Sequence, residues 1–299
     1  MANGLIVVTG ATGHIGSVLA ETLLKKGAKV RAVARHADKL APLAKKGAET
    51  LSADLGDAKA LKKAFDGAET VFVLIPPNYS SQDFRAYQNQ ISTTVADAIK
   101  TTGVKYVVHL SSVGAHLSEG AGPINGLHDS EERLNKLEGI NVLHLRPSYF
   151  MENLLMNIQT IKGMGIAGSP LKRDVPIPVI ATRDIADVAA KRILALDWKG
   201  KEVQELLGPR DYTMDEATRV IGEAIGKKDL KYVEFPYDDA QKAMVGMGLS
   251  PDLARLFNEM NKGFNEGKVK PTQTRSPKTT TPTTLEDFAK TVFAPAFKG

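Results

Sequence analysis

The sequence predicts an α/β protein, with a doubly wound parallel sheet and a second, smaller α+β lobe. Two observations lead to this fold class. Strand and helix patterns alternate through the first half of the chain, which is typical of parallel strands joined by crossover helices. The strand candidates are also apolar runs without strict alternation, as burial on both faces of a sheet requires. After Arg146 this alternation gives way to scattered helices and turns, which predict the smaller lobe.

The elements of the first half follow from their periodicity. Strands are expected at 5–9, 28–34, 48–53, 70–75, 105–112 and 141–146. Helices are expected between them at 17–26, 37–46, 58–65, 83–102 and 127–137. In the fourth helix, Phe84, Tyr87, Ile91, Val95 and Ala98 recur every three or four residues, as a helix packed on a sheet requires.

The second half contains fewer strand signals. Helices are expected at 151–162, 183–196, 213–225, 238–247 and 251–262, a strand at 230–235, and a last helix that begins within 283–286. The segment 163–178 is rich in glycine and proline. We therefore assign 1–147, together with the helix around 183–197, to a nucleotide-binding domain. The segments 148–182 and 198–299 are assigned to the smaller substrate lobe.

Composition excludes several classes of function. The chain has no cysteine, which rules out disulfides, thiol nucleophiles and cysteine-bound metals. Its histidines lack metal-binding spacing, so no metal is expected. The net charge of +5 comes from lysines scattered among acidic residues, which indicates a solvated surface rather than a nucleic-acid face. Neither a signal peptide nor a membrane span is found, so we expect a cytoplasmic protein that does not bind membranes.

A glycine-rich turn follows the first strand. Gly10, Gly13 and Gly16 are spaced G-x-x-G-x-x-G between an apolar run and a helix. Glycine allows a tight turn, close approach of a pyrophosphate, and tight packing of helix on strand, so the context predicts a Rossmann-type dinucleotide site. The residues expected to contact the cofactor here are Thr9, Gly10, Thr12, Gly13, His14, Ile15 and Gly16.

The end of the second strand predicts which dinucleotide is bound. An acidic residue there usually holds the ribose hydroxyls of NAD, but this chain has Arg35, followed by Lys39. A guanidinium suits a 2′-phosphate, so NADP(H) is expected to be preferred over NAD(H). The alternative is a solvated arginine at a helix start. Asp54, with Leu55, is expected near the adenine, and a turn carboxylate is its alternative.

Ligands of open α/β sheets bind at the carboxyl ends of the strands, so the loops after the fourth and fifth strands should line the nicotinamide end of the cleft. The cofactor contacts expected there are Leu74, Ile75, Pro76, Ser111 and Ser112. Tyr79 and Val113 are expected to contact the substrate.

The sequence lacks the usual proton donor of short-chain dehydrogenases. Short-chain dehydrogenases usually use a tyrosine with a lysine four residues later, and no tyrosine here has one. His128 is the candidate catalytic residue, with Glu131 or Glu132 one turn away to hold it, and it is also expected to contact the substrate. A surface histidine at a helix start is the alternative.

Four segments together resemble the NmrA-like family of atypical short-chain dehydrogenases. They are the glycine turn 9–16, the strand 30–35, the segment 145–153 (Leu-Arg-Pro-Ser-Tyr-Phe-Met-Glu-Asn) and the segment 182–188, and Thr-Pro-Thr-Thr-Leu-Glu-Asp-Phe near the end adds to them. The resemblance implies a Rossmann domain, a smaller substrate lobe and NAD(P) in the cleft between them. It also implies that Arg35 and Lys39 contact the 2′-phosphate.

The resemblance also implies roles for further residues, and it allows two functions. Pro147 and Phe150 would lie beside the nicotinamide, and Met151 and Asn153 would contact the substrate, with core packing as the alternative for Phe150 and Met151. The family includes reductases of quinones and azo compounds, and non-catalytic redox sensors that bind a protein partner. We favour an NADPH-dependent oxidoreductase of a small electrophile, since the chain offers no distinct partner-docking helix. An oligomer is compatible with either function.

Overall fold

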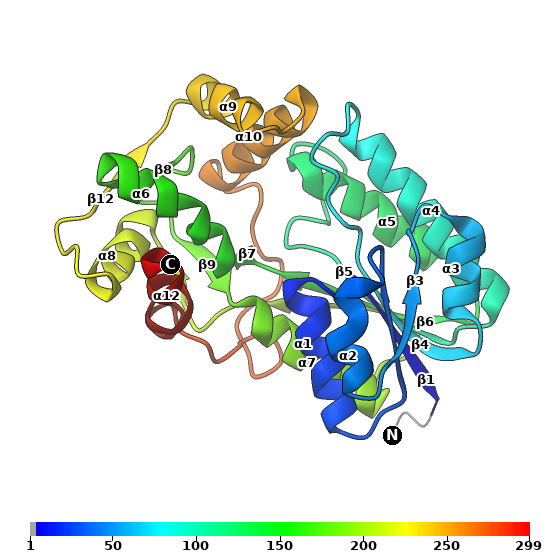
Figure 1. The fold of residues 1–299 in the computed structure, drawn as a ribbon. Coiled ribbons are helices and arrows are strands. Elements are labelled where there is room, and N and C mark those ends of the chain that lie inside the picture. The colour runs from blue at the N-terminus through cyan, green and yellow to red at the C-terminus, as the bar shows by residue number, and fades with distance from the viewer. Residues whose placement is uncertain (1–3) are drawn as a thin grey trace.

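The computed structural model describes residues 4–299, and its largest element is a seven-stranded parallel sheet (Figure 1). The strand order is β10-β6-β5-β4-β1-β2-β3. The strand bounds are β1 (Leu5–Thr9), β2 (Val30–Ala34), β3 (Glu49–Ser52), β4 (Ala68–Val73), β5 (Tyr106–Leu110), β6 (Asn141–Pro147) and β10 (Lys201–Leu206). The chain starts in the middle of the sheet and builds it outward on both sides, so the order reverses between β1 and β4. Such a switch point is where open α/β sheets bind ligands.

Helices cover both faces of this sheet. On one face lie α1 (His14–Lys25), α2 (Ala41–Lys45) and α7 (Thr182–Ala195), and on the other α3 (Ala58–Phe65), α4 (Phe84–Thr102) and α5 (Asn125–Asn135). Consecutive residues of β1 show why the strands are apolar throughout. Ile6 and Val8 join the core under α1 and α7, whereas Val7 joins the core under α3 and α4.

The predicted doubly wound sheet is confirmed, but it has one more strand than the sequence analysis expected. The segment 198–299 was assigned wholly to the smaller lobe, whereas β10 pairs in parallel with β6 at the edge of the main sheet. The reason is its composition: Lys-Glu-Val-Gln-Glu-Leu lacks the apolar run that marks a strand buried on both faces. A strand at the edge of a sheet is less completely covered than a central strand, so polar residues are tolerated there. The first four residues of β10 are accordingly exposed or partly exposed.

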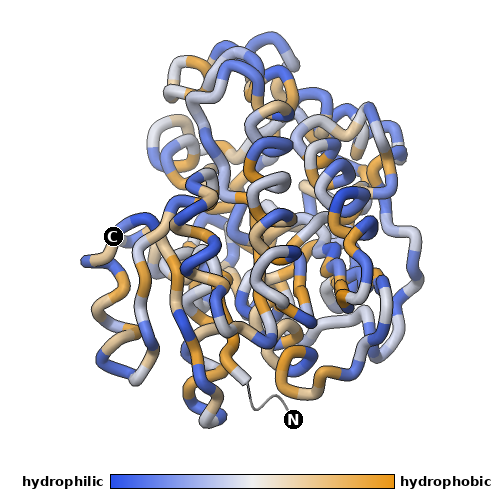
Figure 2. The backbone as a smooth tube through the Cα atoms, turned by 90° about the vertical axis from the view of Figure 1, so that its right-hand side faces the viewer, coloured by the Kyte–Doolittle hydropathy of each residue, from blue (hydrophilic) through white to orange (hydrophobic). Residues whose placement is uncertain are grey.

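The smaller lobe is built from two short sheets and a layer of helices. One sheet has the order β11-β9-β7 and the other pairs β12 with β8. The strands are β7 (Tyr149–Phe150), β8 (Ile166–Ser169), β9 (Ile177–Ile180), β11 (Asp211–Tyr212) and β12 (Lys231–Glu234). The helices are α6 (Ile158–Met164), α8 (Met214–Ala224), α9 (Tyr237–Gly246), α10 (Pro251–Asn265), α11 (Leu285–Phe288) and α12 (Ala294–Lys298). Hydrophobic and hydrophilic residues alternate along the chain (Figure 2).

Several local predictions for this lobe need correction. The expected helix 151–162 is a 3₁₀ segment, Met151–Asn157, followed by α6. The glycine- and proline-rich segment contains β8 and leads into β9, which the sequence analysis did not expect.

Two helix starts in this lobe agree with the sequence. At the start of α8 a capping box is present, since Thr213 Oγ1 accepts from the Glu216 backbone N–H at 3.1 Å and Glu216 Oε2 accepts from the Thr213 N–H at 3.0 Å. The last helix is capped by Thr284, whose side chain accepts from the Asp287 N–H.

Within residues 4–299, none of the helices has both the length and the apolar composition needed to cross a membrane.

Candidate active site

The glycine turn joins β1 to α1 by two close approaches of the backbone. Gly10 has φ +61°, a left-handed conformation that favours glycine, and a Cβ there would lie 2.9 Å from Leu74 Cδ2. At Gly16 a Cβ would lie 2.2 Å from the Gly10 carbonyl oxygen. No residue larger than glycine fits at Gly16 without moving α1 away from the turn, so this glycine serves the packing of helix on strand.

Gly13 differs from its neighbours because the protein itself leaves room for a side chain there. A Cβ at Gly13 would lie 3.4 Å from Gly10 O, an ordinary contact, and the backbone is extended with φ −90° and ψ 172°. Gly13 is the N-cap of α1, and no side chain of residues 4–299 caps this helix. The N–H groups of the first turn therefore receive no side-chain cap, and uncapped N–H groups at a helix start are the arrangement that binds a phosphate.

Thr9 supports this turn from behind. Its side chain is fully buried, with Oγ1 donating to the Phe72 carbonyl at 3.0 Å and accepting from the Leu74 N–H at 3.4 Å. These bonds clamp the end of β1 to the end of β4. The side chain of Thr9 offers no surface to a ligand, in contrast to Thr12 and His14, which are exposed.

The basic residues after β2 are exposed and unpaired. Arg35 directly follows the strand, and Lys39 lies in the short 3₁₀ turn Asp38–Leu40. No acidic side chain of residues 4–299 lies within 4.0 Å of either cation. Two cations at the end of this strand, free of protein anions, are available for a phosphate.

Asp54 and Leu55 lie nearby but are engaged within the protein. Asp54 Oδ1 accepts from the Gly56 N–H at 2.8 Å, which closes a local turn, and the Leu55 side chain is buried. Of the two interpretations given for Asp54, contact with the adenine or a carboxylate that closes a turn, the structure shows the turn carboxylate.

Sequence reasoning missed Tyr87, which lies at the same end of the sheet. Its hydroxyl donates to the Pro76 carbonyl at 3.0 Å. Burial, and next the charge of Asp54, raise the pKa of Tyr87, while the charge of Arg35 lowers it. This phenol therefore binds the loop after β4 and lies within electrostatic influence of the loops after β2 and β3. The helical spacing of Tyr87 in the sequence pointed only to packing.

The loop after β4 reaches across the molecule. Leu74 packs under Gly10, and Ile75 and Pro76 are partly exposed. Tyr79 is 54% exposed, and its carbonyl accepts from the Ser250 N–H at the start of α10 at 2.8 Å. This bond ties the predicted cofactor loop to the smaller lobe.

The loop after β5 is less accessible than predicted. Ser111 is buried and its hydroxyl donates to Glu131 Oε1 at 2.5 Å. Val113 is buried as well, with its N–H donating to the Pro147 carbonyl at 2.9 Å. Of the three predicted contacts in this loop, Ser112 alone keeps partial exposure.

The expected carboxylate partner of His128 was wrong. Glu131 is buried in an ion pair with Arg146, with Arg146 Nε 2.9 Å and Nη2 2.5 Å from the two carboxylate oxygens, and Glu132 is exposed. His128 is held instead by a backbone group, since its Nδ1 lies 2.9 Å from the Ala115 carbonyl oxygen. A carbonyl can only accept, so Nδ1 carries hydrogen and Nε2 is the nitrogen free to exchange a proton.

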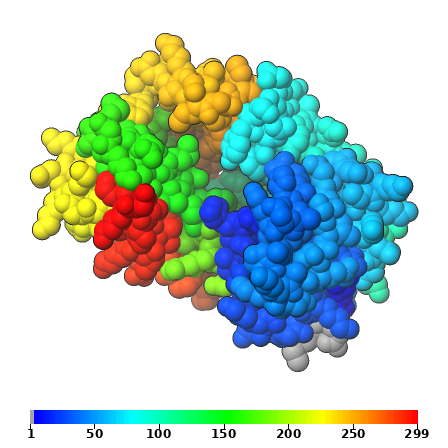
Figure 3. Space-filling model, viewed as in Figure 1, coloured from blue at the N-terminus to red at the C-terminus, as the bar shows by residue number. Residues whose placement is uncertain are grey.

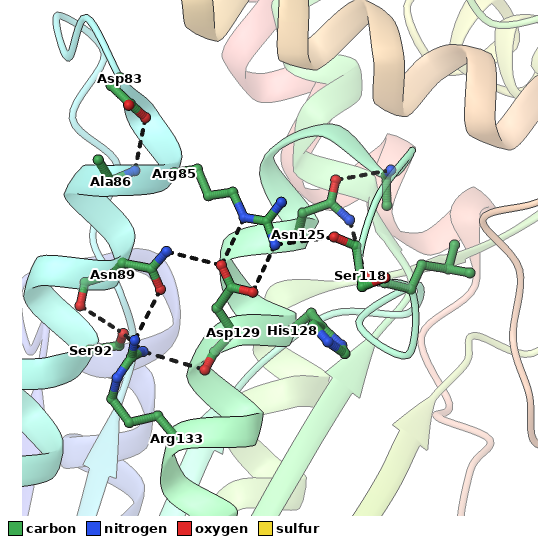
Figure 4. Close-up of polar contacts among 12 residues, drawn as sticks. Asp83, Arg85, Ala86, Asn89, Ser92, Ser118, Asn125, His128, Asp129 and Arg133 are labelled. Carbon is green, nitrogen blue, oxygen red and sulfur yellow. Dashed lines mark hydrogen bonds and ion pairs between the residues drawn. The ribbon is translucent and has the colours of Figure 1, made fainter.

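A polar network next to His128 fixes the position of α5 (Figure 4). Arg85 of α4 donates to both carboxylate oxygens of Asp129, at 2.7 and 2.8 Å, and Asn89 donates to one of them at 2.9 Å. Hydrogen bonding from Arg85 holds the pKa of the Asp129 carboxyl below its usual value. Figure 4 shows His128 pointing away from this network, on another side of α5. The network therefore positions the helix that carries His128.

Residues of the segment after β6 pack into two different hydrophobic cores, the core of the main sheet and the core of the smaller lobe. Pro147 is buried, and Phe150 is partly buried against the core under α1 and α7. Met151 is 0% exposed in the core of the smaller lobe, so core packing describes it and it offers no surface to a substrate. Asn153 is partly exposed and faces the phenol of Tyr149.

The space-filling view shows a hollow between the main sheet and the smaller lobe (Figure 3). The start of the chain, the segment leading into α4, the α10 region and the residues after β6 surround it in this view. These segments include several of the predicted contacts.

Comparison with known proteins identifies the family. The model of the NmrA-like family matches residues 2–289, nearly the whole chain. The chain belongs to the NmrA-like family.

Two curated relatives of this NmrA-like protein are similar over most of their length. An NAD(P)H azoreductase of Xenophilus azovorans is 30% identical over 260 residues, 86% of each chain. Quinone oxidoreductase 2 of Escherichia coli K12 is 29% identical over 272 residues, 88% of this chain and 89% of that one. The solved structure of the NADPH-dependent quinone oxidoreductase QOR2 of Escherichia coli with NADPH has a TM-score of 0.81 and 27% identity, and the match covers 96% of this chain and 99% of that chain.

The residues of this NmrA-like protein fit a dinucleotide. Gly13 keeps a cradle that a larger side chain would fill, the first turn of α1 offers free N–H groups, and Arg35 and Lys39 lie one strand away. A pyrophosphate and an adenosine phosphate need these groups, at the switch point of the sheet.

Proposed function

We propose that this NmrA-like protein binds NADPH in the cleft and reduces a small planar electrophile, a quinone or an azo compound. The observation that carries the proposal is the cradle at Gly13, where the protein leaves space that its own packing does not need. The azoreductase and the quinone oxidoreductase described above support the reaction class.

The cofactor is proposed to lie along the carboxyl ends of β1, β2, β4 and β5. Arg35 and Lys39 bind the 2′-phosphate, and Tyr87 holds the loop after β4 through its bond to Pro76. Since NADH lacks this phosphate, we propose a preference for NADPH. The cofactor contacts are proposed to come from Gly10, Thr12, Gly13, His14, Ile15, Gly16, Arg35, Lys39, Ile75, Pro76, Ser112 and Phe150.

The two lobes are proposed to have different roles, one in binding the cofactor and the other in covering the acceptor. Residues 4–147, with α7 and β10, hold the cofactor, and the smaller lobe closes the cleft over the acceptor. Tyr79 bridges the two through its bond to Ser250. When bound, the nicotinamide supplies a hydride.

This chain orients the acceptor in the cleft. A quinone takes its proton from solvent, whereas a carbonyl acceptor needs a positioned donor. We assign that role to Nε2 of His128 in its protonated form, with the ring oriented by the Ala115 carbonyl.

The test is NADPH oxidation followed with a panel of quinones, azo dyes and carbonyl compounds. Turnover with quinones or azo dyes at saturating NADPH is the expected result. Tight NADPH binding without turnover on any acceptor would contradict an enzyme, and a protein partner captured in only one cofactor state would then favour a redox sensor.

A further inference from the structure

Helix α5 and the loop after β5 are joined by two hydrogen bonds. In the first, His128 Nδ1 lies 2.9 Å from the Ala115 carbonyl oxygen. In the second, the Ser111 hydroxyl donates to Glu131 Oε1 at 2.5 Å. On α5 the two bonded residues are about one helical turn apart. The loop 111–115 and the turn 128–131 therefore form a closed frame with one bond at each end.

The bond at Glu131 is sealed and firmly anchored. Glu131 is 3% exposed and Ser111 is 4% exposed, so water does not compete for this bond. Arg146 of β6 binds both oxygens of the same carboxylate, with Nε at 2.9 Å and Nη2 at 2.5 Å. Paired bonds between a guanidinium and a carboxylate fix both distance and angle. Glu131 thus ties α5 to the ends of β5 and β6 at once.

The bond at His128 lies at the accessible end of the frame. His128 is partly exposed, and its ring is oriented by a backbone carbonyl rather than by a carboxylate of α5. The direction of the ring therefore depends on where Ala115 lies relative to the helix. The sealed bond at the other end of the frame holds the loop and the helix at this separation.

We propose that Glu131 is a positioning residue for His128. Through Ser111 it fixes the loop that carries Ala115, and thereby the direction in which Nε2 of His128 points. The inference rests on the proposed role of His128 as proton donor and deepens it by naming the residue that holds the donor in place. Glu131 takes no part in the proton transfer, since its carboxylate stays paired with Arg146.

The first test is kinetic and uses Ser111→Ala, which removes the sealed bond and leaves the ion pair with Arg146 intact. With carbonyl acceptors kcat should fall about tenfold, because a misplacement of ~1 Å at a reacting group can cost ~10²-fold. With quinones, which take their proton from solvent, kcat should not change, and neither should the Kd of NADP⁺. Glu131→Gln should give the same split and also lower stability, because Arg146 loses its charged partner.

Glu132→Gln is the matched control for Glu131→Gln. It makes the same substitution at the next residue of α5, whose side chain is exposed. Both kinetic constants and stability should stay close to those of the wild type. If Glu131→Gln does not fold, Ser111→Ala alone decides the kinetic test.

The second test needs no turnover. Nitrogen NMR of the full chain, labelled at its six histidines, reports the tautomer of each ring. The signals of His128 are those lost in His128→Ala. At a pH where the ring is neutral, the wild type should carry hydrogen on Nδ1 of His128. In Ser111→Ala the proton should be shared between the two nitrogens, because the acceptor that selects Nδ1 is no longer held in place.

Each outcome decides between the proposals. A wild-type tautomer of His128 in Ser111→Ala overturns the inference, whatever the kinetics. Equal losses with carbonyls and quinones, or weaker NADP⁺ binding, also overturn it, since the role would then be structural. If the wild type reduces no acceptor, the reductase function fails, and the tautomer alone decides the inference. A changed tautomer with wild-type turnover of carbonyls would show that His128 is positioned by Glu131 but is not the proton donor.

Discussion

The two sides of the cleft are built in different ways. On the cofactor side the proposed phosphate cradle consists of backbone N–H groups and glycines, within the one continuous segment that joins β1 to α1. On the proposed acceptor side the groups are side chains, Tyr79 and His128, which come from separate parts of the chain. A backbone cradle is specified by local sequence, whereas a wall of side chains depends on how distant elements pack. The cofactor side should therefore be sensitive to single glycines and the acceptor side to the chemistry of single side chains.

Gly13→Val should give the largest effect and acts only on the cofactor side. Valine adopts the extended backbone of Gly13 readily, and its side chain would occupy the cradle. We expect NADPH affinity to fall at least a hundredfold, about 2.7 kcal/mol or more, with an unchanged circular dichroism spectrum. Equilibrium titration measures the affinity. Gly163→Val is the control, because a Cβ at Gly163 meets nothing within 4 Å; normal NADPH affinity in Gly13→Val would disprove the cradle.

His128→Ala tests the acceptor side. With carbonyl acceptors kcat should fall ~10²-fold, because a positioned general acid contributes about that much, and with quinones it should change little. Steady-state kinetics with both acceptor classes measures the split. His116→Ala, in the exposed part of the neighbouring loop, is the matched control. Equal losses with both classes would show that His128 is not the proton donor.

Arg35→Ala should change cofactor choice without changing the acceptor side. Loss of a charge-assisted hydrogen bond of ~1.5–3 kcal/mol predicts a ten- to hundredfold weaker preference for NADPH over NADH, with NADH affinity nearly unchanged. Binding titrations with both cofactors give the ratio. Arg219 lies on the surface of α8 and is paired with Glu223, so Arg219→Ala should leave the ratio of NADPH to NADH affinity unchanged. A wild type that binds NADH as tightly as NADPH would refute the role of Arg35.

Acid should weaken the main sheet, which carries the cofactor side. His109 of β5 and His144 of β6 are buried with their Nδ1 atoms 3.1 Å apart. Burial lowers the pKa of each to about 3, with a further contribution from His144 for His109 and from Arg146 for His144. Both imidazoles stay neutral in the folded protein, whereas in the unfolded chain they take up protons below a pKa of about 6.5.

The unfolded state therefore binds more protons between pH 6.5 and 3, and stability falls as the pH falls through this window. From pH 7 to pH 5 we expect a loss of about 2 kcal/mol in the free energy of unfolding for each imidazole. Urea unfolding at several pH values measures the slope. His144→Asn removes one titrating group and should reduce the slope; a variant with the wild-type slope would show that this pair does not govern acid stability.

How much the sequence could predict differs between particular residues. The ends of β1 and α3 match the predicted 5–9 and 58–65 because an apolar run and an aspartate N-cap, Asp57, are local signals. The edge strand β10 was missed because its polar composition carries no such signal, and β9 was missed because it lies beside prolines and glycines. The partner of His128 was wrong because Glu131, one turn away on the same helix, binds Arg146 from β6 instead. Spacing along a helix cannot show which strand lies beneath it.

The sequence by itself determined the doubly wound sheet, the glycine turn and the basic end of β2, since alternating apolar runs, glycines and Arg35 act within a few residues of one another. Only the tertiary structure decided that Met151 is core and that Ser111 is sealed by Glu131. The physical reason is that burial and hydrogen-bond partners are properties of the packed chain. Residues more than fifty positions apart, such as Tyr149 and Phe264, become neighbours only when the lobes fold against each other.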